Sequence, residues 1–375
     1  MSRRSRSLTP DPSSYPSSRA VVRMTTAAQV VAAIPHQLGF TPTESLVVLC
    51  CHEPRGQIGL SMRVDLPDEQ VEPVLVDSMV DRVRHERATR VVLALYTEQD
   101  GPLPRQNLID DLRLQLEDLV ITEALLVRGG RFWSYVCSEP ECCPAVGRSV
   151  AEAVGSAPVL LLAAENVLAG RSVLPTRAAL AASVAGPVLL AAQAARQRCE
   201  RALDTAESEL SGTGSLRPAV DDWRAAVDRW RDPPTDLGDR EAARLAMALH
   251  SKAVRDEVAT WVADDRETLL ALVAELCRRT PAPYDAPVAT LLGWLTYACG
   301  GGALVVIALE RALATDPDYA MARMLLDLSN AQVPSAVVRR LLAQEARRLG
   351  SGSVAAGSGR CDREGPDYGP VRRQA

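Results

Sequence analysis

Three cysteines close together in the chain are the residues best suited to chemistry. Cys137 is followed by the adjacent pair Cys142 and Cys143, with Pro144 next. Thiolate and imidazole groups are good zinc ligands, and a structural zinc site needs four of them. His52, at the end of another apolar run, would supply the fourth. The spacing contains no CxxC pair, and adjacent cysteines rarely reach one ion, so zinc is one interpretation and the cofactor stays open.

Two other roles fit the same cysteines. A reduced thiol cluster that stabilises a turn is the ordinary alternative. A redox pair of Cys137 with Cys142 or Cys143 is a third, and it requires a lowered thiol pKa. The chain has nine cysteines, an odd number, and its first 23 residues contain no apolar signal segment. These features indicate a reducing cytoplasm and free thiols.

Polar residues near strand ends form a second candidate site. From the residues alone, its members are Arg63, Asp65, Tyr96, Arg131 and Tyr135. Open α/β sheets bind ligands at such edges, and a pair of arginines suits a carboxylate or a phosphate. Ordinary surface ion pairs are the alternative.

No stronger motif accompanies these two groups. The sequence contains no GxGxxG, no Walker loop, no HExxH and no GxSxG. His36, His85 and His250 stand alone, and we expect them to be solvated or to cap helices. Whether the chain catalyses a reaction therefore stays open.

The elements that must position these residues begin with an α/β domain. A helix is expected over 27–38, started by Thr25 or Thr26 and stopped by Gly39. Apolar and β-branched runs predict strands at 45–52, 57–65, 90–96, 120–127 and 131–137. Amphipathic spacing predicts helices over 68–86 and between Leu108 and Leu119. The order β-β-α-β-α-β-β indicates a mixed sheet in two or three layers.

After about residue 150 the strands give way to helical patterns. We expect an α/β domain at 24–150 and an all-helical domain at 151–348, between disordered tails at 1–23 and 349–375. The 24 uncharged residues of 286–309 are long enough to cross a bilayer. Three glycines, 300–302, break this stretch, so two buried helices and no membrane contact are expected.

A helical hairpin is predicted over 286–330. Gly293, Ala312 and Pro317 fall close to the offsets of the 34-residue TPR pattern. Small residues at the first two positions would let two helices pack closely, and the proline would end the second helix. A concave groove for a protein partner and a plain helical bundle both fit this pattern.

Composition restricts the partners. The net charge is -5, although the tail at 1–23 is basic. Binding nucleic acid over the whole surface requires clusters of excess basic side chains, so no nucleic-acid partner is expected.

Several segments together resemble one family. They are IPHQLGFTPTESLVV, RVDLP, GGRFWSYVCSEPECCP, AAENVLAG and APVATLLGWLTYACGGGALVVIALERALATDPDYAMA. Over roughly residues 24–348 they are similar to an actinobacterial family known as domain of unknown function 4192. The resemblance implies an intracellular protein of GC-rich bacteria and implies no particular activity. Its pattern stresses Trp133 beside Arg63, Asp65 and the three cysteines. Cys50 and Cys51 fall outside it, which weakens a metal site that uses them.

Two hypotheses follow. The first is a cytoplasmic binding or adaptor protein without catalytic activity, which meets a protein partner through its helical region. The alternative is a metal- or thiol-dependent enzyme or regulator that uses the Cys137, Cys142 and Cys143 turn and the sheet edge. Metal content of the purified protein separates them.

Overall fold

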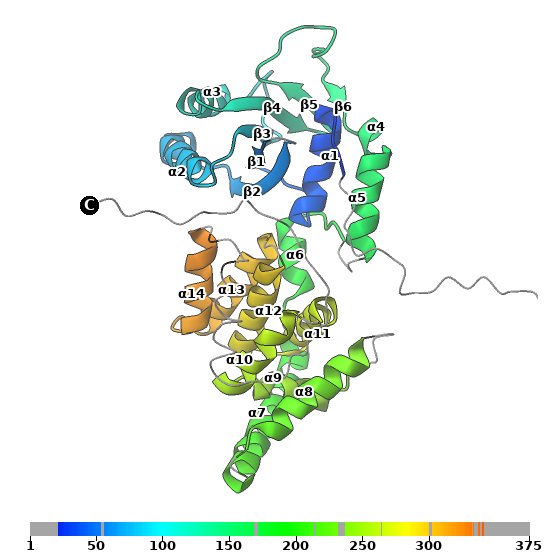
Figure 1. The fold of residues 1–375 in the computed structure, drawn as a ribbon, viewed down its shortest axis with the longest axis vertical. Helices are drawn as coiled ribbons and strands as arrows, with labels where there is room; N and C mark the ends of the chain where they lie inside the picture. Colours follow the sequence, from blue (N-terminus) through cyan, green and yellow to red (C-terminus); the bar gives the residue numbers. More distant parts are fainter. Residues whose placement is uncertain are drawn as a thin grey trace, which may run out of the picture.

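The chain forms a sheet-containing part followed by a helical part, shown in Figure 1. The computed structural model describes residues 22–53, 56–168, 172–213, 215–231, 237–263, 265–299 and 302–331, and positions 333, 337 and 340. Apart from residues 22 and 23, the tails predicted at 1–23 and 349–375 lie outside the described residues.

The sheet is mixed, as predicted. Its strands are β1 (Ser45–His52), β2 (Gln57–Asp65), β3 (Arg90–Tyr96), β4 (Val120–Arg128), β5 (Arg131–Ser134) and β6 (Arg148–Ser149). They lie in the order β2-β1-β3-β4-β5-β6, and β3 and β4 form the parallel pair. Two boundaries differ from the prediction, since β4 ends one residue later and β5 ends three residues earlier, and β6 was not expected. β6 has only two residues, too few to show an alternating pattern.

Helices cover both faces of the sheet. In Figure 1, α2 (Glu72–His85) and α3 (Gln106–Gln115) lie on one side, and α1 (Ala27–Leu38) lies on the other. The two faces follow from the strand period of two residues. In β1, for example, Leu46 and Val48 pack toward α2 and α3, whereas Val47 and Leu49 pack toward α1. The α/β part therefore has three layers.

Helix α1 begins and ends where the sequence indicates. The Thr26 side chain accepts a hydrogen bond from the Gln29 amide, and Gly39 follows the last turn with φ +83°. α4 (Ala151–Val154) and α5 (Ala157–Leu168) continue the layer on this face, because a small buried cluster joins Ala32 of α1 to Ala153 and Val159.

The remaining helices build the helical part. They are α6 (Arg177–Ser183), α7 (Leu189–Thr213), α8 (Arg217–Trp230), α9 (Asp239–Ala248), α10 (Lys252–Thr260), α11 (Arg266–Arg279), α12 (Ala286–Ala298), α13 (Ala303–Thr315) and α14 (Ala320–Asn330). Three of these helices, α9, α10 and α11, lie within 239–279. The break between α9 and α10 at His250 and Ser251 contains neither glycine nor proline, so the sequence gives little signal for it.

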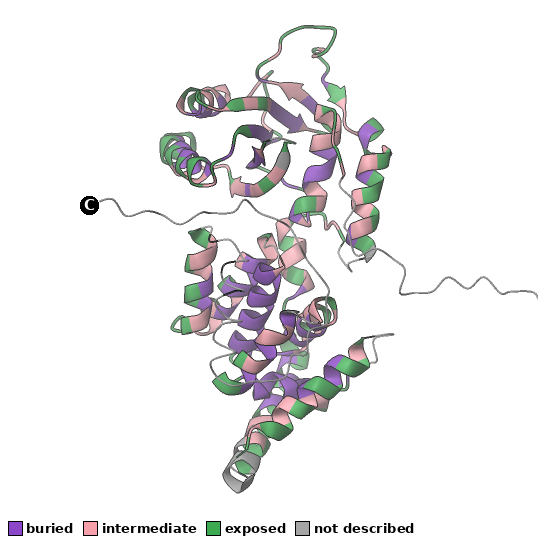
Figure 2. Cartoon of the chain, in the orientation of Figure 1, coloured by how far each residue is buried: buried purple, intermediate pink, exposed green. Residues whose placement is uncertain are grey.

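The uncharged stretch splits into α12 and α13, as expected. Every residue of α12 is buried, and Figure 2 shows this helix in the middle of the helical part. A Cβ at Gly293 would lie 2.6 Å from the Leu309 side chain, so the glycine permits the close approach of the two helices. Within the described residues, no helix combines the length and the apolar character needed to cross a membrane.

The two parts of the chain touch each other. Phe40, just after α1, forms an isolated parallel bridge with Leu174, just before α6. Leu180 of α6 and Ala303 at the start of α13 pack against the apolar cluster on the α1 face of the sheet. The first turns of two helices thus cover part of that face.

Candidate metal centre

The three predicted cysteines lie in one loop between β5 and β6. Ser134, the last residue of β5, fixes the start of this loop because its hydroxyl accepts hydrogen bonds from the amides of Val136 and Cys137, both at 3.1 Å. A serine that binds the amides of the next residues favours a turn over a continued strand. This contact explains why β5 stops before Cys137.

The end of the loop is held by two side chains of β5. The Trp133 Nε1 donates to the Ala145 carbonyl at 3.0 Å, and the Arg131 guanidinium donates to the Gly147 carbonyl at 2.9 Å. Gly147 has φ +71°, and a Cβ there would lie 2.5 Å from the Trp133 ring. The glycine is therefore required both by its backbone conformation and by the indole beside it.

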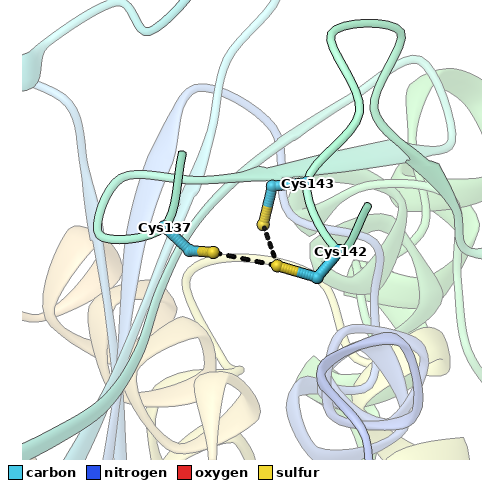
Figure 3. A group of neighbouring side chains, drawn as sticks. All are labelled: Cys137, Cys142 and Cys143. Carbon is cyan, nitrogen blue, oxygen red and sulfur yellow. Dashed lines mark hydrogen bonds between the residues drawn. The ribbon is translucent and has the colours of Figure 1, made fainter. Parts of the chain in front are cut away.

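The loop brings the three sulfur atoms together (Figure 3). The Sγ atoms of Cys137 and Cys142 are 2.9 Å apart, and those of Cys142 and Cys143 are 3.6 Å apart. All three lie within 4.8 Å of one another. The amides of Cys142 and Cys143 both donate to the Glu139 carbonyl, which makes the tight turn that points adjacent side chains to one place.

The three thiols are electrostatically different. The hydrogen bond between Cys137 and Cys142, helped by the Glu139 backbone and Cys143, lowers the pKa of Cys137 below the usual thiol value. The same hydrogen bond raises the pKa of Cys142, and partial burial raises the pKa of Cys143 to about 12. Cys137 is therefore the first of the three to become a thiolate, the form that binds metals and attacks electrophiles.

This geometry can accept a metal ion with modest adjustment. Two thiolates bound to one zinc at about 2.3 Å in a tetrahedron lie about 3.8 Å apart. The Cys142–Cys143 distance of 3.6 Å already matches that value, and the Cys137–Cys142 distance of 2.9 Å must widen by about 0.9 Å. Adjacent cysteines rarely reach one ion, but the Sγ atoms of Cys142 and Cys143 are close enough to do so in this loop.

His52, the fourth ligand suggested by the sequence, lies elsewhere. Its Nε2 is 3.1 Å from a carboxylate oxygen of Glu86. β1 and β5 are three strand positions apart in the sheet, or about 14 Å. The thiol group found among the described residues contains only cysteines, so this structure does not assemble the set with His52.

The second candidate set is spread over three strands, β2, β3 and β5. Arg63 and Asp65 pair with each other at 2.6 Å on β2, at one edge of the sheet. The Arg63 guanidinium also lies over the Phe40 ring, 5.7 Å from its centre. Tyr96 on β3 is buried on the same face, which is the one that α1 covers.

The other three members, Arg131, Trp133 and Tyr135, each donate a side-chain hydrogen bond to a backbone carbonyl. Arg131 and Trp133 fasten the cysteine loop, and the Tyr135 hydroxyl donates to the Pro104 carbonyl at 2.6 Å. β5 lies four strand positions from β2, about 19 Å away. The six residues therefore do not line one cleft, and only Arg131 and Trp133 belong with the thiols.

Unpaired polar atoms gather on the α1 side of the sheet. Within the described ranges, the buried side-chain atoms that have no hydrogen-bond partner are His36 Nδ1, Ser45 Oγ, Arg63 Nε and the Tyr96 hydroxyl. Ser45 stands directly opposite Tyr96 on one side and Asp65 on the other. An unpaired buried polar group costs free energy, so this row destabilises the fold.

Sequence reasoning missed three residues that shape the loop: Ser134, Gly147 and Arg148. Arg148 donates to the Cys142 carbonyl at 3.3 Å. Gly147 offered a usable signal, because a glycine shortly after a proline favours a turn and tolerates a positive φ.

Fold and site together define a chain of two parts. A mixed-sheet α/β part carries the three-cysteine loop, and an all-helical part follows it in the sequence. Residues 28–336 match the family described as Domain of unknown function (DUF4192). The chain belongs to this family. No curated protein and no solved structure matches the chain.

Proposed function

We propose that this chain binds a thiophilic metal ion, such as Zn²⁺, through Cys137, Cys142 and Cys143. The convergence of the three sulfur atoms within 4.8 Å carries the proposal. The loop that presents them is fixed at both ends before any ion arrives, so little ordering free energy is lost on binding. A reducing compartment such as the cytoplasm would keep the thiols ready.

Three protein ligands suit an accessible site. Structural zinc sites are closed by four protein ligands, whereas three ligands leave a position for water, a solute or a partner. Cys142 is exposed, and Cys137 and Cys143 are partly so. An all-sulfur set favours soft ions over Mg²⁺ or Ca²⁺. The proposal is therefore a metal-responsive binding protein, and the sheet edge at Arg63 and Asp65 has no part in it.

The test is metal titration of the full chain, purified reduced and free of metal. Co²⁺ gives a thiolate-to-cobalt absorption band whose strength increases with the number of bound sulfurs, and Zn²⁺ should displace it. We expect one equivalent to saturate the band. Cys142→Ser should remove most of it, because Cys142 contacts both other sulfurs.

Cys299→Ser is the matched control, since Cys299 is also partly exposed but lies at the end of α12. It should leave the titration unchanged. A band of equal strength in the Cys142→Ser variant, or no thiolate band in the wild-type chain, would refute the proposal.

A second candidate is the adaptor role of the helical part. It is supported by a shallow hollow along α14 of about 530 Å³, where Met324 is 51% exposed beside Leu328 and Asp327. We propose that an amphipathic helix of a partner protein, with an apolar residue next to a basic one, binds there. The TPR-like character of the α12–α13 hairpin belongs to the same proposal.

The adaptor role is tested by substitution in the hollow. Immobilised full-length chain should retain one defined partner, and Met324→Glu should abolish the retention because it places a second acid beside Asp327. Leu114→Glu, on the distant α3 and 68% exposed, is the control. Equal retention by both variants would argue against the α14 surface.

A further inference from the structure

The helical part carries a basic groove far from the thiol loop. Its lining comes from α7, α8 and α9, which lie at the lower end of the molecule in Figure 1. The lining residues are Arg198, Arg201, Ala202, Thr205, Arg229, Arg240, Glu241 and Arg244. The groove measures about 680 Å³, within the size range of small-molecule sites.

The groove is strongly positive although the chain as a whole is acidic. Five arginines and one glutamate line it, an excess of four positive charges, while the net charge of the chain is -5. Three of the arginines have acidic neighbours: Arg198 lies 3.4 Å from Asp239, Arg244 lies 3.1 Å from Asp222, and Arg229 contacts Glu241. These ion pairs hold the side chains along the walls.

Two arginines are free to bind. Arg201 on α7 and Arg240 in the first turn of α9 are exposed, and neither forms an ion pair or a side-chain hydrogen bond with the residues that the structure describes. α7 and α9 pack directly against each other, so these two guanidinium groups face the same groove from adjacent helices. Unpaired arginines with paired arginines around them create a local field that attracts anions.

The lining chemistry indicates the class of ligand. Guanidinium groups bind phosphate through two parallel N–H···O bonds, and several of them suit a chain of phosphates. Among the residues that the structure describes, none of the lining side chains is an aromatic ring on which a base could stack. We propose that this groove binds a small molecule carrying two or more phosphate groups, recognised through its phosphates by Arg201 and Arg240. The proposal does not depend on metal binding at the thiol loop.

The experiment is calorimetric titration of the full-length chain with inorganic triphosphate, with orthophosphate and sulfate as comparison anions at equal ionic strength. We expect triphosphate to bind with a Kd below about 1 mM and the comparison anions to bind more weakly. Arg201→Gln and Arg240→Gln should each weaken triphosphate binding about tenfold or more, because each removes a charge-assisted contact. Since neither side chain has a partner among the described residues, both variants should keep the native melting temperature.

Arg217→Gln is the control. It removes one exposed arginine from α8 outside the groove and should leave the affinity unchanged. Absence of triphosphate binding, or equal binding by the Arg201→Gln and Arg240→Gln double variant, would overturn the proposal. A single-stranded oligonucleotide that needs the same two arginines and binds far more tightly than triphosphate would overturn it too, because the partner would then be a polynucleotide.

Discussion

At the scale of single residues, two buried tyrosine hydroxyls contribute to stability with opposite sign, because one has a hydrogen-bond partner among the described residues and the other has none. The Tyr96 hydroxyl is buried without a partner, and burial raises its pKa well above the usual tyrosine value. The Tyr135 hydroxyl, also on a mostly buried side chain, donates to the Pro104 carbonyl. The same substitution at the two sites therefore separates the cost of an unmade hydrogen bond from the gain of a made one.

We predict that Tyr96→Phe leaves stability unchanged or raises it by up to about 1 kcal/mol, because it deletes an unpaired polar atom. Tyr135→Phe should lower stability by about 1 kcal/mol, because it leaves the carbonyl without its donor. Urea denaturation of the two variants measures both values. A larger loss for Tyr96→Phe than for Tyr135→Phe would mean that the Tyr96 hydroxyl has a bound water or ligand as its partner.

The cysteine loop makes a second prediction at this scale. Because Cys137 and Cys142 share a hydrogen bond, the pKa of Cys137 is lowered, and its thiolate forms at a pH where the other two thiols remain protonated. Limited alkylation below the usual thiol pKa should modify Cys137 first. In the Cys142→Ala variant that pKa should rise, so alkylation of Cys137 at the same pH should slow. Peptide mass analysis over a pH series measures this, and unchanged Cys137 kinetics in the variant would contradict it.

At the scale of elements, the loop between β5 and β6 depends on one glycine. Gly147→Ala places a Cβ against the Trp133 ring and also strains a backbone with φ +71°, so it should loosen the loop and weaken metal binding at the thiols about tenfold. Gly130→Ala isolates the collision, because Gly130 has φ +72° but open space around it. Cobalt titration of both variants measures the effect. Equal losses would show that backbone strain alone is responsible.

The elements were largely predictable from the sequence, and the failures have physical causes. Ser45–His52 was readable because β1 is buried on both faces and is therefore continuously apolar. The site was only half readable. The cysteines stood out because they are close together in the chain. The turn that brings their sulfur atoms together depends on backbone hydrogen bonds to the Glu139 carbonyl, which leave no pattern in residue types, and on the Ser134 hydroxyl. The distance of His52 from the loop could not be foreseen, because the order of strands in a sheet is not encoded locally.

At the scale of the whole molecule, one buried ion pair ties the helical part together. The Arg311 guanidinium on α13 lies 2.8 Å from the Asp285 carboxylate and donates to the carbonyls of Cys277, Thr280 and Val184. It therefore joins the ends of α6 and α11 to the start of α12. A charge with this many partners contributes more to uniqueness of packing than an exposed pair does.

Arg311→Met should cost about 3–5 kcal/mol, because Asp285 would remain buried without its cation. Arg323→Met, which removes an exposed pair with Asp318, should cost under about 1 kcal/mol. Equilibrium unfolding in urea compares them. Similar losses in the two variants would show that the Arg311 network adds nothing beyond a surface ion pair.

Helix α12 has a consequence for how the chain is made. All of its residues are buried. The helices that pack against it include α13 and α14, which are synthesised after it. Until α13 and α14 have been synthesised, α12 lacks its native neighbours and exposes its apolar side chains to solvent. The helical part can therefore complete its folding only after α14 has been synthesised. Chains that terminate before residue 303 should aggregate or be degraded rather than accumulate as a stable amino-terminal fragment.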